Sequence, residues 1–125
     1  MSIIQVSAPV VSFDGALFEG DSDFLAEIVT LFLETYPQLI SAIEEAIERQ
    51  DAVALCRTTH TMKGAVANFG AEAVVEQVRA LEMMGKTGDL SASGEAWRGL
   101  QVQMETFVPE LEAVLKRVTE EQVVT

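Results

Sequence analysis

Apolar residues recur every three or four positions through most of the chain, and this spacing predicts helices. The first such stretch follows two residues suited to capping a helix, Asp21 and Ser22. Its expected core positions are Phe24, Leu25, Ile28, Leu31, Phe32, Leu39, Ile40, Ile43 and Ile47. Pro37 interrupts the stretch and removes a backbone donor, so the pattern allows either two helices or one kinked helix.

Three further stretches show the same period. Asp51 can cap the second helix, and Gly70 suits the left-handed residue that commonly ends one. Its expected core positions are Leu55, Met62, Val66 and Phe69. The third helix has a stripe of Val74, Val75, Val78 and Leu81, and the two glycines of residues 85–90 indicate the loop that ends it. The last stretch keeps the same apolar spacing despite Pro109, and this predicts a long helix that packs along a bundle. Its expected core positions are Trp97, Leu100, Met104, Phe107, Leu111, Val114 and Val118.

No strand pattern competes with these helices, so the sequence predicts an all-α protein. Four helices with short connections indicate an antiparallel four-helix bundle, preceded by a short additional helix around Phe13 to Phe18. A chain of 125 residues fits one domain. We expect it to occupy residues 12–118, with tails at 1–11 and 119–125.

Composition narrows the functional classes. The net charge of −12 argues against nucleic-acid binding, which depends on clustered cations. The single cysteine, Cys56, allows no internal disulfide and indicates a reducing compartment. No apolar run is long enough to span a membrane, and the start of the chain lacks the features of a signal peptide. We therefore expect a cytoplasmic protein without membrane contact.

Charge is distributed unevenly along the chain. Residues 1–48 contain nine acidic residues and no basic one, whereas residues 52–71 contain no acidic residue but include Arg57 and Lys63. This stretch also holds His60, the only histidine. A local excess of positive charge on an acidic protein indicates a surface that meets an anion.

Helical rotation places His60 away from the core. At about 100° per residue, His60 lies opposite Phe69, while Val53, Arg57, Gly64 and Ala67 lie on its own side. Glycine inside a helix lowers helix stability by about 1 kcal/mol relative to alanine, so the position of Gly64 needs an explanation. Either it allows close packing against another helix or it leaves the imidazole open to a large partner. Since Gly64 shares the outward face, the second explanation is favoured.

At these residues the sequence resembles the histidine-containing phosphotransfer (HPt) domains of bacterial phosphorelays. The match is carried by Thr59-His60-Thr61-Met62-Lys63-Gly64-Ala65 and by Asn68-Phe69-Gly70-Ala71. It extends to Glu19-Gly20-Asp21, Phe32, Asp51, Leu81-Glu82 and Gly88-Asp89-Leu90. Thr59 departs from the small alanine usual before the histidine, a mild change at the flank of the motif.

The resemblance implies a role for each matched residue. His60 is the expected phosphoacceptor, Lys63 assists the phosphoryl group, and Gly64 permits docking. Asn68 and Gly70 match structural positions. The remaining docking residues are expected on the face of His60, namely Arg57, Val53 and Ala67.

The resemblance also implies the partners. A receiver domain, a histidine kinase or both would exchange the phosphoryl group with this chain. The receiver supplies the acceptor aspartate and Mg²⁺, so no metal or cofactor is expected on this chain. We expect a monomeric phosphocarrier rather than an enzyme.

Two other functional classes are weighed against this one. A helical adaptor could bind a receiver or kinase without carrying phosphate, but retention of His60, Lys63 and Gly64 argues against it. A metal-assisted or nucleophilic enzyme would need further catalytic groups, and Cys56 lacks the additional Cys or His that a metal site requires. We expect Cys56 and the Met83-Met84 pair to serve packing. Gly85-Lys86-Thr87 lacks the first glycine and the preceding strand of a nucleotide-binding loop.

Overall fold

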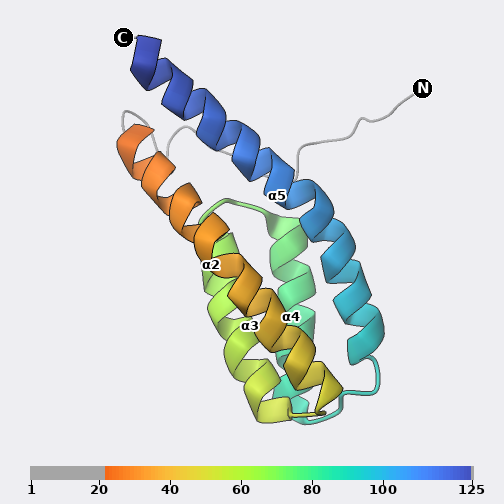
Figure 1. Ribbon diagram of the computed structural model, residues 1–125. Helices are drawn as coiled ribbons and strands as arrows, with labels where there is room; N and C mark the ends of the chain where they lie inside the picture. The colour runs from red at the N-terminus through yellow and green to blue at the C-terminus, as the bar shows by residue number, and fades with distance from the viewer. Residues whose placement is uncertain (1–21, 125) are drawn as a thin grey trace, which may run out of the picture.

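The computed structural model describes residues 22–124, with the side chains of residues 23–120. This part of the chain forms four helices and no strand: α2 (Ser22–Glu48), α3 (Ala52–Ala67), α4 (Glu72–Thr87) and α5 (Ser93–Val124) (Figure 1). The all-α prediction is confirmed. The additional helix expected around Phe13 to Phe18, the capping candidate Asp21 and the tail at 1–11 lie outside the described residues.

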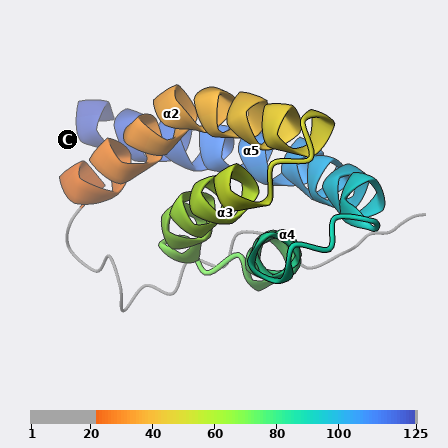
Figure 2. The ribbon, with the colours of Figure 1, turned by 90° about the horizontal axis from the view of Figure 1, so that it is seen from below.

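The helices alternate in direction and form an antiparallel four-helix bundle. Helices α2 and α4 each pack against both α3 and α5. At 1.5 Å per residue, α2 is about 40 Å long and α3 about 24 Å. The amino-terminal half of α2 and the carboxyl-terminal half of α5 therefore extend beyond α3 and α4 (Figures 1 and 2).

The core follows the predicted stripes of the last three helices. All core positions expected for α3 and α5, together with Val74, Val78 and Leu81 of α4, are buried. Phe32, Phe69 and Phe107 form an edge-to-face cluster with ring centroids 5.6 to 6.0 Å apart. This cluster joins α2, the end of α3 and α5, and such pairs add to the energy of burying their area.

Helix α2 differs from its prediction in two ways. It continues through Pro37 as one helix, so the interpretation as two helices is wrong. Phe24 and Leu31 are 49% and 61% exposed, although both were expected in the core, whereas Val29 is fully buried. The difference arises because this end of α2 extends beyond α3, so α3 does not cover its flank (Figure 1).

The end of α4 also corrects the prediction. Residues 85–87 were expected in a loop but form the last turn of the helix. The helix ends at Thr87 because Gly88 takes the left-handed conformation, with φ 83°, and donates its N–H to the Met84 carbonyl at 2.9 Å. The residues before Gly85 are helical, whereas a nucleotide-binding loop needs a strand and a glycine-rich turn at that place.

Helix α3 is fixed at both ends. The Asp51 carboxylate accepts a hydrogen bond from the Ala54 N–H at 3.0 Å, and Gly70 has φ 65° after the last turn, as predicted.

Helix α5 continues to Val124, past the domain boundary expected at residue 118. None of the described helices is both long and apolar enough for a transmembrane span.

Candidate functional site

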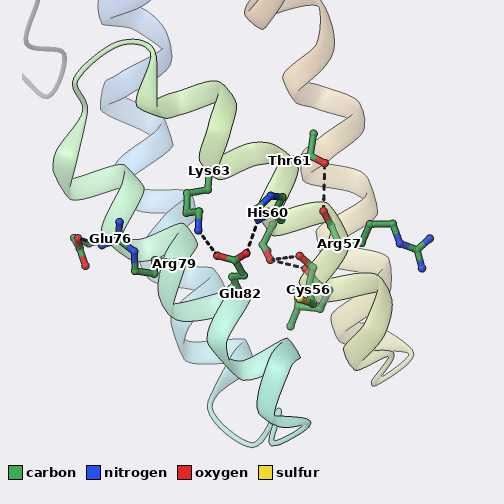
Figure 3. Close-up of polar contacts among 10 residues, drawn as sticks. Cys56, Arg57, His60, Thr61, Lys63, Glu76, Arg79 and Glu82 are labelled. Atoms are coloured by element: carbon green, nitrogen blue, oxygen red, sulfur yellow. Dashed lines mark hydrogen bonds and ion pairs between the residues drawn. The ribbon is translucent and has the colours of Figure 1, made fainter.

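His60 lies on the outer face of α3, as the rotation predicted. Its side chain is 70% exposed, whereas Leu55, Met62 and Val66 on the opposite face are fully buried. The imidazole projects toward α4, where it meets one carboxylate (Figure 3). The imidazole is therefore accessible to a partner on one side and is held by a side chain of α4 on the other.

Glu82 of α4 supplies that carboxylate and binds two residues of α3 at once. Its Oε2 lies 2.7 Å from His60 Nδ1, and its Oε1 accepts a hydrogen bond from Lys63 Nζ at 2.6 Å (Figure 3). Glu82 is only 2% exposed and is the one buried charged side chain in the described part of the chain. A buried carboxylate is costly unless it is paired and hydrogen-bonded, and these two contacts meet that need.

The bridge determines which ring nitrogen of a neutral His60 carries the proton. The hydrogen bond from Lys63 is the main cause that lowers the pKa of Glu82 below its ordinary value of 4.5, and the His60 contact adds to it, against the opposing effect of burial. Glu82 is then ionised at neutral pH and can only accept hydrogen bonds. Nδ1 of a neutral His60 must carry the proton, which leaves the Nε2 lone pair free.

Gly64 lies one turn after His60 with open space beside it. A Cβ atom at this position would find no heavy atom within 4 Å beyond its own helix backbone. The close-packing explanation of this glycine is therefore wrong. Val53, Arg57 and Ala67 are also exposed, and Val53 is 68% exposed despite being apolar.

His60 and these four exposed residues share one side of α3, which we call the His60 face. Its members are Val53, Arg57, His60, Gly64 and Ala67. Arg57 extends away from Glu82, on the other side of the imidazole (Figure 3). Since α3 contains no acidic residue, this face differs in charge from the acidic protein that carries it.

The other residues considered from the sequence lie outside the His60 face. Thr59 is fully buried, and its hydroxyl donates to the Leu55 carbonyl at 2.6 Å, so its departure from alanine leaves no unpaired group. Cys56 is half-buried, as expected. Met84 packs against the core, whereas Met83 is 49% exposed and does not. Asn68 is the residue that ends α3.

Glu82 is the functional residue that the sequence reasoning missed. The Leu81-Glu82 motif contributes to the family resemblance but does not by itself indicate a role for Glu82. The signal was available, because Glu82 follows Val78 by four residues and so lies on the apolar stripe of its helix. A charge at a core position indicates a buried partner. Among the described residues, no cluster of three His, Cys, Asp or Glu side chains is arranged to hold a metal ion.

Comparisons with known proteins identify the family and the fold of this chain. A family model described as the Hpt domain matches residues 27–121. A search of curated proteins gave no match. Among solved structures, histidine-containing phosphotransfer protein B (HptB) from Pseudomonas aeruginosa PAO1 is similar, with a TM-score of 0.81 and 21% sequence identity over 89% of this chain and 98% of that one. That likeness shows a shared bundle fold. Because the family model covers most of the chain, this protein belongs to the Hpt domain family.

Proposed function

We propose that this protein is a phosphorelay intermediate in which Nε2 of His60 carries the phosphoryl group. The observation that carries the proposal is an exposed imidazole whose inner nitrogen is held by a buried, ionised carboxylate. Nδ1 is occupied by Glu82, so the outward nitrogen is the one available to a partner. The phosphoryl donor is the phosphoaspartate of a receiver domain or the phosphohistidine of a kinase.

Transfer from a receiver exchanges one bond for another. The Nε2 lone pair attacks phosphorus, an N–P bond forms, and the P–O bond to the aspartate breaks with its electron pair left on the aspartate carboxylate. The imidazole ring gains positive charge while Nδ1 keeps its proton. The Glu82 carboxylate, 2.7 Å from Nδ1, compensates that charge. In the next step the aspartate of a second receiver attacks phosphorus, and Nε2 leaves with its electron pair.

Lys63 adds positive charge beside the reacting group. Its ammonium and the imidazole bind the same carboxylate, so the two side chains lie close together. Lys63 is 27% exposed, and its flexible stem allows the ammonium to move from Glu82 toward a phosphoryl oxygen. One lysine neutralises only part of the charge of the moving group. The Mg²⁺ of the receiver would neutralise the rest, and this chain needs no cofactor of its own.

The His60 face is the surface on which the partner would dock. Gly64 leaves room beside the imidazole, Val53 and Ala67 offer small apolar contacts, and Arg57 offers a positive charge. Membership in the Hpt family favours receiver domains and histidine kinases as partners. We also propose that the protein is a monomeric phosphocarrier of the cytoplasm. The adaptor hypothesis is not favoured, because an adaptor has no need of an imidazole oriented by a buried carboxylate.

The direct test is transfer of labelled phosphate. The full chain is incubated with a panel of receiver domains phosphorylated on aspartate, and label on this chain is tested for the acid lability of a phosphohistidine. We expect labelling by at least one receiver and none in the His60→Gln variant. Labelling of His60→Gln to the wild-type level would contradict the site, and binding of receivers without any labelling would favour the adaptor.

A further inference from the structure

Helices α3 and α4 meet without an intervening side chain at Gly85. A Cβ atom on this residue would lie 2.6 Å from the Cys56 nitrogen, 2.8 Å from the Ala52 oxygen and 2.9 Å from the Cys56 Cα. All three are backbone atoms of α3, so no side-chain rotation could make room. Any residue other than glycine would require the two helices to move apart.

Gly85 lies directly beside the Glu82 bridge. It follows Glu82 by three residues, about 4.5 Å along the axis of α4, and both residues are buried against α3. The two contacts of Glu82, at 2.7 and 2.6 Å, are already short hydrogen bonds that span the gap between the helices. Hydrogen bonds weaken beyond about 3.2 Å, so a separation of roughly 1 Å at this level would break the contact with the shorter His60 side chain.

We propose that Gly85 is a positioning residue for His60, because its missing side chain lets α4 approach α3 closely enough for Glu82 to reach the imidazole and Lys63 together. Its expected effect on phosphoryl transfer rests on the function proposed above. Its effect on the imidazole does not, since the bridge exists within this chain alone. This close approach also explains why a glycine occurs inside α4, where it lowers intrinsic helix stability.

The other described glycines provide a matched control. Gly94 in α5 has open space where a Cβ would lie, with no heavy atom within 4 Å beyond its own helix backbone. Gly85→Ala and Gly94→Ala therefore make the same chemical change inside a helix. Only the first of them forces α3 and α4 apart.

The test reads the ring of His60 by ¹⁵N NMR, which is unambiguous because the chain has one histidine. At a pH where the imidazole is neutral, we expect wild type and Gly94→Ala to show the Nδ1–H tautomer, and Gly85→Ala to lose that preference. With a saturating phosphorylated receiver, transfer to Gly85→Ala should be slower by at least about tenfold, as misplacement of a reacting group by about 1 Å predicts. The receiver concentration at half-saturation should change little.

A second variant keeps the test decisive if Gly85→Ala does not fold. Glu82→Asp retains the charge and the helix packing but draws the carboxylate back by one methylene, so it should lose the same tautomer preference. A wild-type ring signature in folded Gly85→Ala, or in Glu82→Asp, would overturn the inference. If no receiver labels the wild type, the phosphorelay proposal fails, but the ring measurement still decides the role of Gly85.

Discussion

Helices α3 and α4 have 16 residues each, whereas α2 has 27 and α5 has 32, and each of the two long helices contains a proline. The short pair meets through Gly85 and the buried Glu82 bridge. The long pair meets through aromatic rings, with Phe32 and Phe107 5.6 Å apart. The polar groups that orient His60 therefore lie between α3 and α4, where the two backbones approach closely. Large apolar side chains hold α2 against α5. Substitutions that impair function should therefore differ from those that lower stability.

The largest expected effect on function comes from His60→Gln. It should abolish phosphoryl acceptance and leave the melting temperature nearly unchanged, because the side chain is 70% exposed. Acid-labile labelling and thermal unfolding by circular dichroism check the two halves of the prediction. If this variant unfolds, His60 also stabilises the bundle, and the short helix pair does not differ from the long pair in the way described above.

The largest expected effect on stability comes from Phe107→Ala in the long pair. The ring is fully buried and contacts both Phe32 and Phe69, so its loss should cost about 3 to 5 kcal/mol of unfolding free energy. Urea denaturation measures this cost. The folded fraction should still accept phosphate at the wild-type rate, and a defect in that fraction would show that the long pair also orients His60.

Glu82→Gln tests the bridge through its pH dependence. The pKa of Glu82 is lowered on folding, so its ionised form adds stability above about pH 4.5, and this contribution is lost as the pH falls below 4.5 through the lowered value. Glu82→Gln should lower unfolding free energy at pH 7 by about 1 to 3 kcal/mol. The difference from wild type should shrink on acidification, and a difference that is constant from pH 7 to 3 would contradict an ionised bridge.

Lys63→Ala should slow transfer at saturating receiver by an amount equivalent to about 1 to 3 kcal/mol in the barrier, less than the loss of His60. Lys63→Arg should restore only part of the rate, because a planar guanidinium is a poor replacement for a compact ammonium. Single-turnover kinetics separate this effect from binding. If only the affinity falls and the saturated rate is intact, Lys63 belongs to the docking surface.

Gly64→Gln separates docking from folding. The space around Gly64 is open within this chain, so stability should stay the same or rise, while an approaching receiver is obstructed. We expect transfer slower by at least tenfold, or about 1.4 kcal/mol in the barrier. Gly94→Gln adds the same side chain to α5 and is the control. Equal rates in both variants would remove the docking role of Gly64.

Much of the site was accessible from the sequence because it depends on one helix. Rotation about a single axis placed His60 opposite Phe69 and put Gly64 on the open side, and local signals at Asp51 and Gly70 gave the ends of that helix. The same logic failed at Phe24 and Leu31, whose apolar character was read as burial. Periodicity shows which side of a helix is apolar, but it does not show whether another helix extends far enough to cover it.

The sequence by itself determined the all-α class, the core faces of α3, α4 and α5, and an outward histidine with a lysine and a glycine beside it. These features follow from the backbone period and from chemistry within a few residues. Only the tertiary structure decided which nitrogen of His60 is held, because Glu82 lies 22 residues away in the chain and reaches His60 across an interhelical gap. The width of that gap depends on the packing of two helices at Gly85, which no pattern within one helix records.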